Sequence, residues 1–526
     1  MVTTVDDIFL EIGELGGEQW KQLLLISLIH TYYPFHMMSY SFTAKEQDFT
    51  CHTNDNETTL HNACPNGQNE QCLQIRYQSA SSETSAVSEW TLICDRSWLR
   101  PLTMSLFMGG VMVGALLFGF VSDGHGRRFT VILTLAGMVI SGQLGQYAQT
   151  FTSFCLVQMI NGFFCGGHIL PLFVLLNELI GPSKRGLAAI YMAITWSCGK
   201  YRTLMFQMMT IIGQLEYSVY IGLIALSVLA SNIRYWRDLT GATTLIGIPM
   251  MVSAWFLLES PRWFLSKGNF HLANAVLQKI AEGNGKPYKP EYILKCSVED
   301  PGLKKSPKSF SVTTLFRPSL LKITMIMLYA WFVNSSSYYG LTLAASNAKT
   351  GYNIYWATAV SAFVEIPACF GASYLIDTYG RMKALSNLMI GAGCGLLAIY
   401  LLASFGSIVF GIATISKLFI SASFTVIYIH TGEIYPTVFR NTAMGVMAIS
   451  SRFGGIASPY LAELGSSWPN LHFIVFGLLT FSSGIFNRRL PETQGQPLPE
   501  SLEDLLDLVQ KPKNSTKYEK LSTSII

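Results

Sequence analysis

A charged motif closes one long apolar run of this chain and recurs at the end of another, 254 residues further along. Asp123 and Arg127 reappear in the second copy as Asp377 and Arg381. A second pair keeps a seven-residue separation in both copies, at an offset of 255: Glu178 with Arg185, and Glu433 with Arg440. A repeat of this length indicates that the chain consists of two homologous halves.

Both halves have the composition of a membrane protein. Hydrophobic residues make up 50% of the 526 residues and charged residues only 13%, which argues against a soluble multidomain protein. Three apolar stretches clearly exceed the roughly 18 residues that suggest a bilayer-spanning helix, namely 100–121, 354–376 and 406–429. These stretches are expected to be helical, because a membrane β-barrel would show alternating segments of about 10 residues instead.

The apolar segments predict an all-α polytopic protein with twelve helices in two groups of six. Four first-half spans are clear, at 20–42, 100–121, 130–147 and 151–180. The second-half spans are expected at 320–345, 354–376, 384–405, 406–432, 441–463 and 469–486. The domains are then an N-terminal segment (1–19), a first half (20–259, with a loop at 43–99), a connecting loop (260–318), a second half (319–488) and a tail (489–526).

One region of the first half departs from the repeat. Arg185 and Glu259 are 74 positions apart, whereas the corresponding Arg440 and Glu492 are separated by 52. Removing 200–216 would join 188–199 to 217–230 as one helix followed by a turn. We interpret 200–216 as an insertion or a retained coding segment, with an error in the gene structure as the alternative. Such an insertion would distort the fifth helix.

The distribution of Lys and Arg predicts the orientation in the membrane. Ten of these residues lie between 260 and 318, whereas 42–99 contains three. The positive-inside rule therefore places the first loop in the cytosol and the second outside, with both termini cytosolic. The first 19 residues are acidic and lack the apolar core of a signal peptide. The net charge of +4 says little by itself, because nucleic-acid binding would need basic residues gathered on one surface.

Two segments outside the spans have apolar residues at helical spacing. The first contains Ile8 and Ile12, and the second, 270–281, contains Ala273, Leu277 and Ile280. The second is expected to be an amphipathic helix along the cytosolic face. Leu502, Leu505, Leu506 and Val509 repeat the pattern near the C-terminus.

The external loop contains Cys51, Cys64, Cys72 and Cys94. An even number of cysteines in an oxidising compartment predicts two disulfides, with three possible pairings. Asn56 begins a glycosylation sequon in the same loop. A metal site is the alternative for the cysteines, but neither CxxC spacing nor a nearby His pair supports it, so no metal is expected.

Three charged residues lie near the middle of apolar spans: Glu365, Lys417 and Arg452. Each is unfavourable in lipid by about 2.5 to 3.5 kcal/mol on insertion scales, so these side chains are expected to face a cavity or one another. Glu365 can form a structural pair with Lys417 or with Arg452, but three charges cannot all pair, and one positive charge is left over. The planar guanidinium of Arg452 is suited to binding a carboxylate.

Aromatic and histidine side chains accompany these charges. Tyr338, Tyr339 and Trp331 share one span and can line a cavity that offers ring faces to an ammonium group, with ordinary helix packing as the alternative. His30, His36, His168 and His430 fall in or near spans. A titrating histidine there can link transport to a co-transported proton, and hydrogen-bonded packing is again the alternative. Nothing in the sequence specifies self-association.

The repeated acidic and basic residues have a physical rationale. An Asp at a helix end and Arg residues in a short loop can bridge neighbouring helices while the outer mouth is open, and breaking these contacts lets the two halves rock. A topological reading is the alternative, because any tight cytosolic loop collects Arg. The repetition of the spacing in both halves favours the gating role.

Several motifs resemble a known family. The run Gly119 to Arg128, Glu259-Ser-Pro-Arg262-Trp263 and Pro491-Glu492-Thr493 are similar to signatures of the major facilitator superfamily. The run Glu89 to Arg100, after the cysteine-bearing loop, resembles the organic cation, anion and zwitterion transporters, as do 331–341, 364–367 and 433–441. The resemblance covers nearly the whole chain and departs from the family at 200–216, at 39–48 and at Gly124, where the family usually carries a basic residue.

The resemblance implies a major facilitator fold, alternating access in the plasma membrane and no cofactor. Cation carriers of this family tend to carry an acid near position 452, and anion and carnitine-like carriers an Arg, so Arg452 favours an organic anion or a carnitine-like zwitterion. The gating residues implied are Asp123, Arg127, Arg128, Glu178, Arg185, Glu259 and Arg262 in the first half, and Asp377, Arg381, Glu433, Arg440 and Glu492 in the second.

Two other functions remain open at this point. A sugar carrier shares the Glu259-Ser-Pro-Arg262 and Pro491-Glu492-Thr493 endings, although the leftover charge at Arg452 and the cysteine loop argue against it. A non-transporting receptor or scaffold is the reading that would follow if 200–216 disrupts the fifth helix. An enzyme is not expected, because no nucleophile–base spacing, metal cluster or phosphate-binding glycine loop stands out in the sequence.

Overall fold

The structure is a computed structural model of the 526-residue chain. It describes residues 5–181, 221–290 and 312–494, apart from 46, 53–58, 62–63, 65–71, 73, 78–83, 348–353, 403–405, 437–439 and 469, and a few positions beyond 494. The proposed insertion at 200–216, Arg185 and the sequon residue Asn56 lie outside the described residues.

The first half forms one helical bundle. Its helices are α2 (Gly17–His30), α3 (Tyr33–Met37), α4 (Tyr40–Thr43), α6 (Leu99–His125), α7 (Arg127–Gln146), α8 (Phe151–Leu179), Ile221–Asn232, α11 (Trp236–Leu245) and α12 (Gly247–Ala254). The predicted single helix over 20–42 is wrong in detail, because the chain divides there into α2, α3 and α4. Pro34 in the first turn of α3 explains one break, since proline has no N–H to continue the ladder of the preceding helix.

The described part of the second half forms a second bundle of six helices, each close to one predicted span. They are α16 (Pro318–Asn347), α17 (Ile354–Tyr379), α18 (Arg381–Leu401), α19 (Gly406–Ile434), α20 (Arg440–Ser467) and α21 (Leu471–Asn487). Within the described parts of both bundles, six helical stretches are long and apolar enough to cross a membrane: Cys94–His125, α7, α8, α17, α18 and Ile408–Ile434. The predicted all-α, two-bundle architecture is confirmed.

Glycines allow α6 and α8 to pack at very short range. A Cβ added at Gly114 would lie 1.8 Å from the carbonyl oxygen of Phe163, and one at Gly162 would lie 2.1 Å from that of Phe107. In the second half, Gly454 of α20 approaches α16 in the same way. Small residues are typical of such interfaces, because close van der Waals contact rather than the hydrophobic effect drives helix association in lipid.

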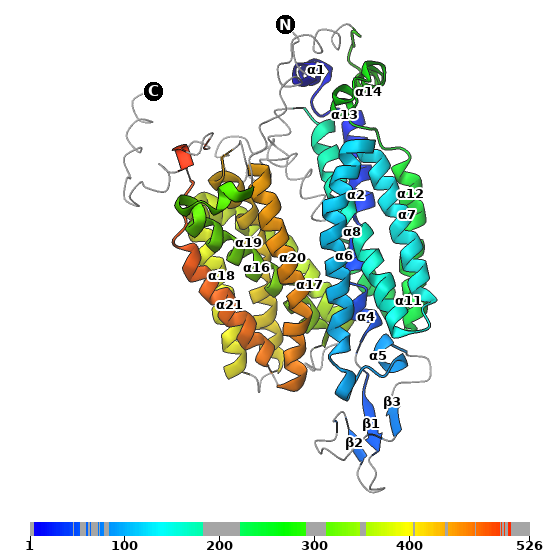
Figure 1. Ribbon diagram of the computed structural model, residues 1–526, viewed down its shortest axis with the longest axis vertical. Helices are drawn as coiled ribbons and strands as arrows, with labels where there is room; N and C mark the ends of the chain where they lie inside the picture. The colour runs from blue at the N-terminus through cyan, green and yellow to red at the C-terminus, as the bar shows by residue number, and fades with distance from the viewer. Residues whose placement is uncertain are drawn as a thin grey trace.

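A small disulfide-bonded sheet marks one end of the first bundle, called the strand face below. It contains β1 (Phe49–His52), β2 (Thr59–His61) and β3 (Gln74–Tyr77), antiparallel in the order β2-β1-β3. The disulfides Cys51–Cys72 and Cys64–Cys94 confirm the predicted number of two and select one of the three pairings. Figure 1 shows the sheet beyond the helix ends, near α4 and α5 (Ala86–Glu89).

Three short helices gather at the opposite end, called the N-terminal face: α1 (Val5–Ile12), α13 (Pro261–Ser266) and α14 (Phe270–Gly283). The predicted amphipathic helix over 270–281 is present as α14. α14 packs against α13 and α2, and its apolar residues belong to the same buried cluster as Ile8, Phe9 and Ile12 of α1, so other helices of this chain cover them. Asn284 also donates to the carbonyl of Ile12 at 3.0 Å. Leu505 is buried in the second half, and Leu502, Leu506 and Val509 lie outside the described residues.

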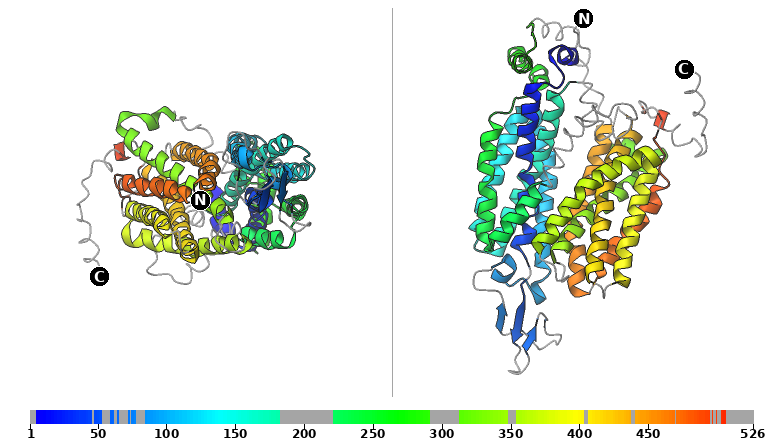
Figure 2. Two further views of the ribbon diagram at one scale, coloured as in Figure 1. Left: turned by 90° about the horizontal axis from the view of Figure 1, so that it is seen from below. Right: turned by 180° about the vertical axis from the view of Figure 1, so that it is seen from behind.

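The two bundles lean together at the strand face, and their described helices diverge toward the N-terminal face (Figures 1 and 2). Contacts across the halves include an ion pair between Arg100 of α6 and Glu463 of α20. Ser105 of α6 also donates to the carbonyl of Ile456 of α20 at 2.7 Å. The structure therefore has its halves in contact on the strand side.

Candidate functional site

Two of the three mid-span charges form an ion pair inside the second half. The Nζ atom of Lys417 on α19 lies 2.8 Å from Oε1 of Glu365 on α17, and the two side chains are only 4% and 1% exposed. Lys417 also donates to Ser361 at 2.5 Å, and the hydroxyl of Tyr338 on α16 donates to Glu365 Oε2 at 2.8 Å. The buried carboxylate is therefore neutralised by a lysine and held by a phenol from a third helix.

Arg452 is placed separately from this pair, where the two halves meet. Its half-buried side chain on α20 interacts with Tyr339 of α16 and with Tyr33 of α3 in the other half, and Tyr428 also acts on it electrostatically. Phenols are uncharged at neutral pH, so these neighbours offer hydrogen-bonding groups without cancelling the positive charge. The positive charge of Arg452 is thus not part of the Glu365–Lys417 ion pair.

The predicted aromatic residues have different surroundings. The rings of Tyr338 and Tyr339 meet edge to face, with centroids 5.2 Å apart, and the Nζ atom of Lys417 lies 5.4 Å from the centroid of Tyr338. Trp331 is fully buried instead and donates to the hydroxyl of Thr431 at 3.0 Å. Tyr338 and Tyr339 accordingly lie beside the charges, whereas Trp331 packs between α16 and α19.

Sequence reasoning missed Tyr33, Tyr428 and Ser361 as neighbours of the charged groups. Each is a polar residue in an apolar span without a charge or a repeated motif to mark it. Tyr33 is the most informative of the three, because its position within the broken first helix brings a side chain of the first half to Arg452. Helical spacing alone does not reveal a contact between segments this far apart in the chain.

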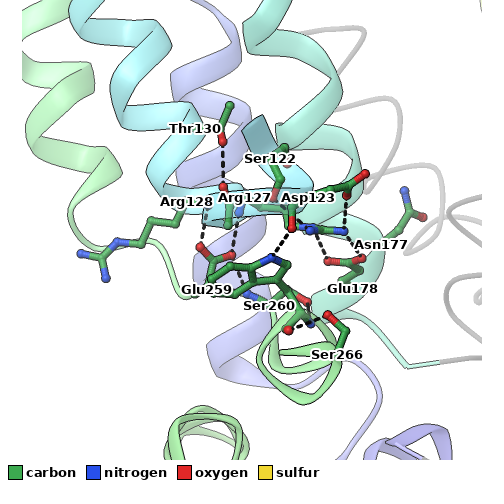
Figure 3. Close-up of polar contacts among 12 residues, drawn as sticks. Ser122, Asp123, Arg127, Arg128, Thr130, Asn177, Glu178, Glu259, Ser260 and Ser266 are labelled. Carbon is green, nitrogen blue, oxygen red and sulfur yellow. Dashed lines mark hydrogen bonds and ion pairs between the residues drawn. The ribbon is translucent and has the colours of Figure 1, made fainter. Parts of the chain in front are cut away.

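A polar network joins four segments of the first half at the N-terminal face (Figure 3). Arg127 is the first residue of α7. Its Nη2 atom lies 3.1 Å from Oδ1 of Asp123, and its Nε atom lies 3.0 Å from Oε2 of Glu178 on α8. Glu259 accepts hydrogen bonds from the backbone N–H groups of Arg127 and Arg128, both at 3.0 Å. Burial raises the pKa of the Glu259 carboxyl, while these N–H groups and Arg127 act in the opposite direction.

The second half builds the equivalent network. Arg381, fully buried at the start of α18, binds Glu433 of α19 through Nε at 3.0 Å and through Nη2 at 3.2 Å. Glu492 accepts the backbone N–H groups of Arg381 at 2.8 Å and Met382 at 3.2 Å. The backbone carbonyl of Asp377 accepts a hydrogen bond from the side-chain amide of Gln494 at 2.8 Å, two residues after Glu492.

Each network thus ties helices within one half. Glu178 and Glu433 bind the arginines of the first motif, Arg127 and Arg381. The other repeated arginine, Arg440, donates to the carbonyl of Tyr435 at 3.2 Å, and its counterpart Arg185 lies outside the described residues. A further predicted residue, Arg262, forms an ion pair with Asp6 of α1, which the motif reasoning did not foresee.

Three of the four predicted histidines have hydrogen-bonding neighbours in the structure. His36 lies 2.9 Å from Asn161, His168 lies 3.3 Å from Thr134, and His430 lies 2.9 Å from the carbonyl of Pro491. Among the described residues, no group of three or more His, Cys, Asp or Glu side chains is placed to hold a metal ion.

Comparison with known proteins agrees with this architecture. The family described as sugar (and other) transporter matches residues 26–505. An organic cation transporter protein of Drosophila melanogaster is 31% identical over 548 residues, and the alignment covers 96% of this chain and 95% of the fly protein. A solute carrier family 22 member 15-like protein of Xenopus tropicalis is 33% identical over 507 residues, covering 95% of this chain and 96% of its own.

A solved structure shares the fold. The inward-open xylose transporter XylE from E. coli superimposes with a TM-score of 0.61, covering 93% of this chain and 99% of its own, at 16% sequence identity. At this identity the likeness concerns the fold alone. Because the family match covers most of the chain and the relatives align along nearly their full length, the chain belongs to the sugar (and other) transporter family of the major facilitator superfamily and, within it, to the solute carrier 22 membrane transporters, which are not enzymes.

Proposed function

We propose that this protein carries small organic ions across the plasma membrane by alternating access, and that its cargo is an organic anion or a carnitine-like zwitterion. The names of its relatives, an organic cation transporter protein and members of solute carrier family 22, support organic ions as the class. The observation that carries the preference for a carboxylate is the charge balance among Glu365, Lys417 and Arg452.

That balance leaves one positive charge in excess. Glu365 is neutralised by Lys417 at 2.8 Å and engaged by Tyr338, so it is a poor site for a cationic ligand. Arg452 has phenols beside it and keeps its charge. A carboxylate that accepts two N–H groups from a guanidinium forms a charge-assisted bidentate pair, one of the strongest polar contacts available to a small ligand. Arg452 is therefore proposed as the group that binds the carboxylate.

The aromatic residues beside this charge suit a zwitterion. Tyr339 contacts Arg452, and the ring of Tyr338 lies edge to face with that of Tyr339. A quaternary ammonium group is attracted to the face of an aromatic ring. A ligand with a carboxylate on Arg452 and its ammonium group against these rings would satisfy both ends. This arrangement supports carnitine-like compounds as the zwitterionic cargo.

Orientation and domain boundaries are part of the proposal. Disulfides on the strand face and Lys and Arg in the 260–318 loop support an extracellular strand face and cytosolic termini. The units proposed are 1–19, 20–259, 260–318, 319–488 and 489–526. The networks around Arg127 and Arg381 are proposed to keep each half intact while the two halves rock.

Uptake by cells that express the chain tests the proposal. The panel contains carnitine, aromatic and aliphatic monocarboxylates, quaternary amines without a carboxylate, and hexoses, with surface biotinylation to measure delivery to the membrane. Saturable uptake of carboxylated compounds well above that of the amines and hexoses is expected. Preferential uptake of the amines would reject the anion preference, hexose uptake would favour the sugar-carrier reading, and inertness with full surface delivery would favour a scaffold.

A further inference from the structure

Among the described residues, the side-chain contacts that join the halves at the strand face include an ion pair and a stacked pair of rings. Arg100, in the first turn of α6, forms an ion pair with Glu463 near the end of α20. Phe42 of α4 stacks on Tyr355 at the start of α17, with ring centroids 5.7 Å apart and ring planes 10° from parallel. In both pairs the partners come from different halves. Neither pair belongs to the charged repeat or to the carboxylate site proposed above.

The ion pair lies at the edge of the interface between α6 and α20. The side chains of Arg100 and Glu463 are 10% and 18% exposed, so the pair is shielded from solvent without being sealed. The backbone carbonyl of Arg100 accepts a hydrogen bond from Tyr40 at 2.5 Å. Both charges line a small, partly open hollow, whose wall also includes Tyr40, Ala44, Leu343 and Pro459. The hollow therefore has walls from both halves.

Because its partners lie on different halves, the Arg100–Glu463 ion pair has to break when the strand face opens. Alternating access requires the strand face to open when the N-terminal face closes, and that motion has to separate α6 from α20. A shielded ion pair stabilises the closed face, because removing one partner leaves an uncompensated charge in the interface. Once the halves separate, both charges become hydrated, so the open state needs no replacement partner. Such a contact holds the face closed and can still be broken in each cycle.

We propose that Arg100 and Glu463 form the outer latch of the transport cycle and set the share of molecules closed at the strand face. The inference rests on alternating access with an extracellular strand face, and it does not depend on which ion is carried. Arg100 and Glu463 act on the position of the two halves, so they are positioning residues rather than cargo ligands.

Cysteine accessibility tests the latch without any substrate. Ala44→Cys places a thiol on the wall of the hollow. Position 44 is only partly exposed in the closed face, so a membrane-impermeant methanethiosulfonate reagent is expected to react with this thiol faster from outside when the strand face opens. Labelling rates of this introduced thiol are measured on intact cells and normalised to surface protein. The parent chain with Ala44 gives the background from the native free cysteines. Failure of the proposed transport activity would leave this measurement unaffected.

Three variants in the Ala44→Cys background decide the outcome. Glu463→Gln and Arg100→Gln are each expected to raise the labelling rate by roughly threefold to tenfold, the range expected for a partly shielded pair. The exchange Arg100→Glu with Glu463→Arg is expected to return the rate toward that of Ala44→Cys alone. Arg96→Gln is the matched control, because Arg96 is exposed and its loss removes the same charge four residues away; its rate is expected to stay unchanged.

Equal labelling in Glu463→Gln and in Ala44→Cys alone, with normal surface delivery, would overturn the proposal. So would an exchange variant that labels as fast as the single variants, since that would show that the pairing itself is not responsible. Glu463→Gln changes one atom in a side chain near the end of its helix, so it decides the matter even where an Arg100 variant fails to reach the surface.

Discussion

Glu259 and Glu492 occupy equivalent positions in the two halves, and each carboxylate accepts two consecutive backbone N–H groups at the start of a helix. The helices are α7 and α18, and each follows a glycine with positive φ: Gly126 at +105° and Gly380 at +87°. A Cβ on either glycine would lie 2.4 or 2.5 Å from the carboxylate. The repeated Gly-Arg motif is thus explained as a turn that opens a helix onto a glutamate far away in sequence.

The first prediction concerns this turn. Gly126→Ala is expected to lower the stability of the detergent-solubilised protein by about 1 to 3 kcal/mol, because alanine is strained at positive φ and its Cβ collides with Glu259. Gly124→Ala is the control, since nothing lies within 4 Å of a Cβ there. Thermal unfolding followed by size-exclusion chromatography measures the difference. Equal midpoints for the two variants would contradict the assigned role of the turn.

A second prediction exploits the buried ion pair. Lys417→Met removes the charge that neutralises Glu365, so the second half gains a carboxylate without a cationic partner. The ratio of quaternary-amine uptake to carboxylate uptake is expected to rise roughly tenfold or more. Adding Glu365→Gln to this variant removes the new charge and is expected to bring the ratio back toward that of the unchanged protein. An unaltered ratio in Lys417→Met at normal surface level would show that the pair does not control selectivity.

The close contact between α6 and α8 gives a third prediction. Gly114→Ala inserts a methyl group 1.8 Å from the carbonyl oxygen of Phe163, so the two helices have to move apart. Overpacking of this kind is expected to destabilise the protein by about 1 to 3 kcal/mol. Gly109→Ala, five residues earlier on the same helix, meets no atom within 4 Å and is expected to be tolerated. Surface expression and melting temperature compare the two, and matching losses would argue against this packing.

A fourth prediction addresses the docking of α1 at the N-terminal face. Phe9 is fully buried in the shared cluster, so Phe9→Asp is expected to detach α1 and to lower stability by several kcal/mol, by analogy with about 3 to 5 kcal/mol for a core Phe→Ala change. Asp6→Asn breaks only the half-exposed ion pair with Arg262 and is expected to change stability by about 0 to 1 kcal/mol. Proteolysis at the N-terminus reports detachment. Similar resistance in both variants would mean that the apolar contact is not what holds α1.

The sequence predicted what depends on local pattern. Long apolar runs indicated α6, α7 and α8 of the first bundle and the helices of the second, and four cysteines in one loop indicated the number of disulfides. The repeat also pointed to Arg127 and Arg381, which form corresponding networks. In each case the information lies in composition or in a fixed spacing.

Contacts between segments far apart in the sequence could not be predicted from composition or spacing. Arg100 and Glu463 lie 363 residues apart, and neither repeats in the other half. The apolar face of α14 indicated that lipid or protein covers it, and the pattern does not distinguish the two. In the structure α14 packs against α13 and α2, and its apolar residues share a buried cluster with α1. The meeting of Tyr33 with Arg452 depends on how the two halves dock, which no local pattern specifies.

The role of Arg452 in selecting the cargo is tested most directly by the transport of a matched pair of ligands by purified protein in liposomes. One ligand carries a carboxylate and the other has the same skeleton with an amide, and both are compared in the unchanged protein and in Arg452→Ala. Lys322→Ala, which removes an exposed positive charge from the same half, is the control. Arg452→Ala is expected to raise the KM of the carboxylate roughly 10- to 100-fold, the range for a lost charge-assisted contact, and to leave the KM of the amide nearly unchanged. An equal change for both ligands, or none for the carboxylate, would contradict the claim that Arg452 selects the cargo.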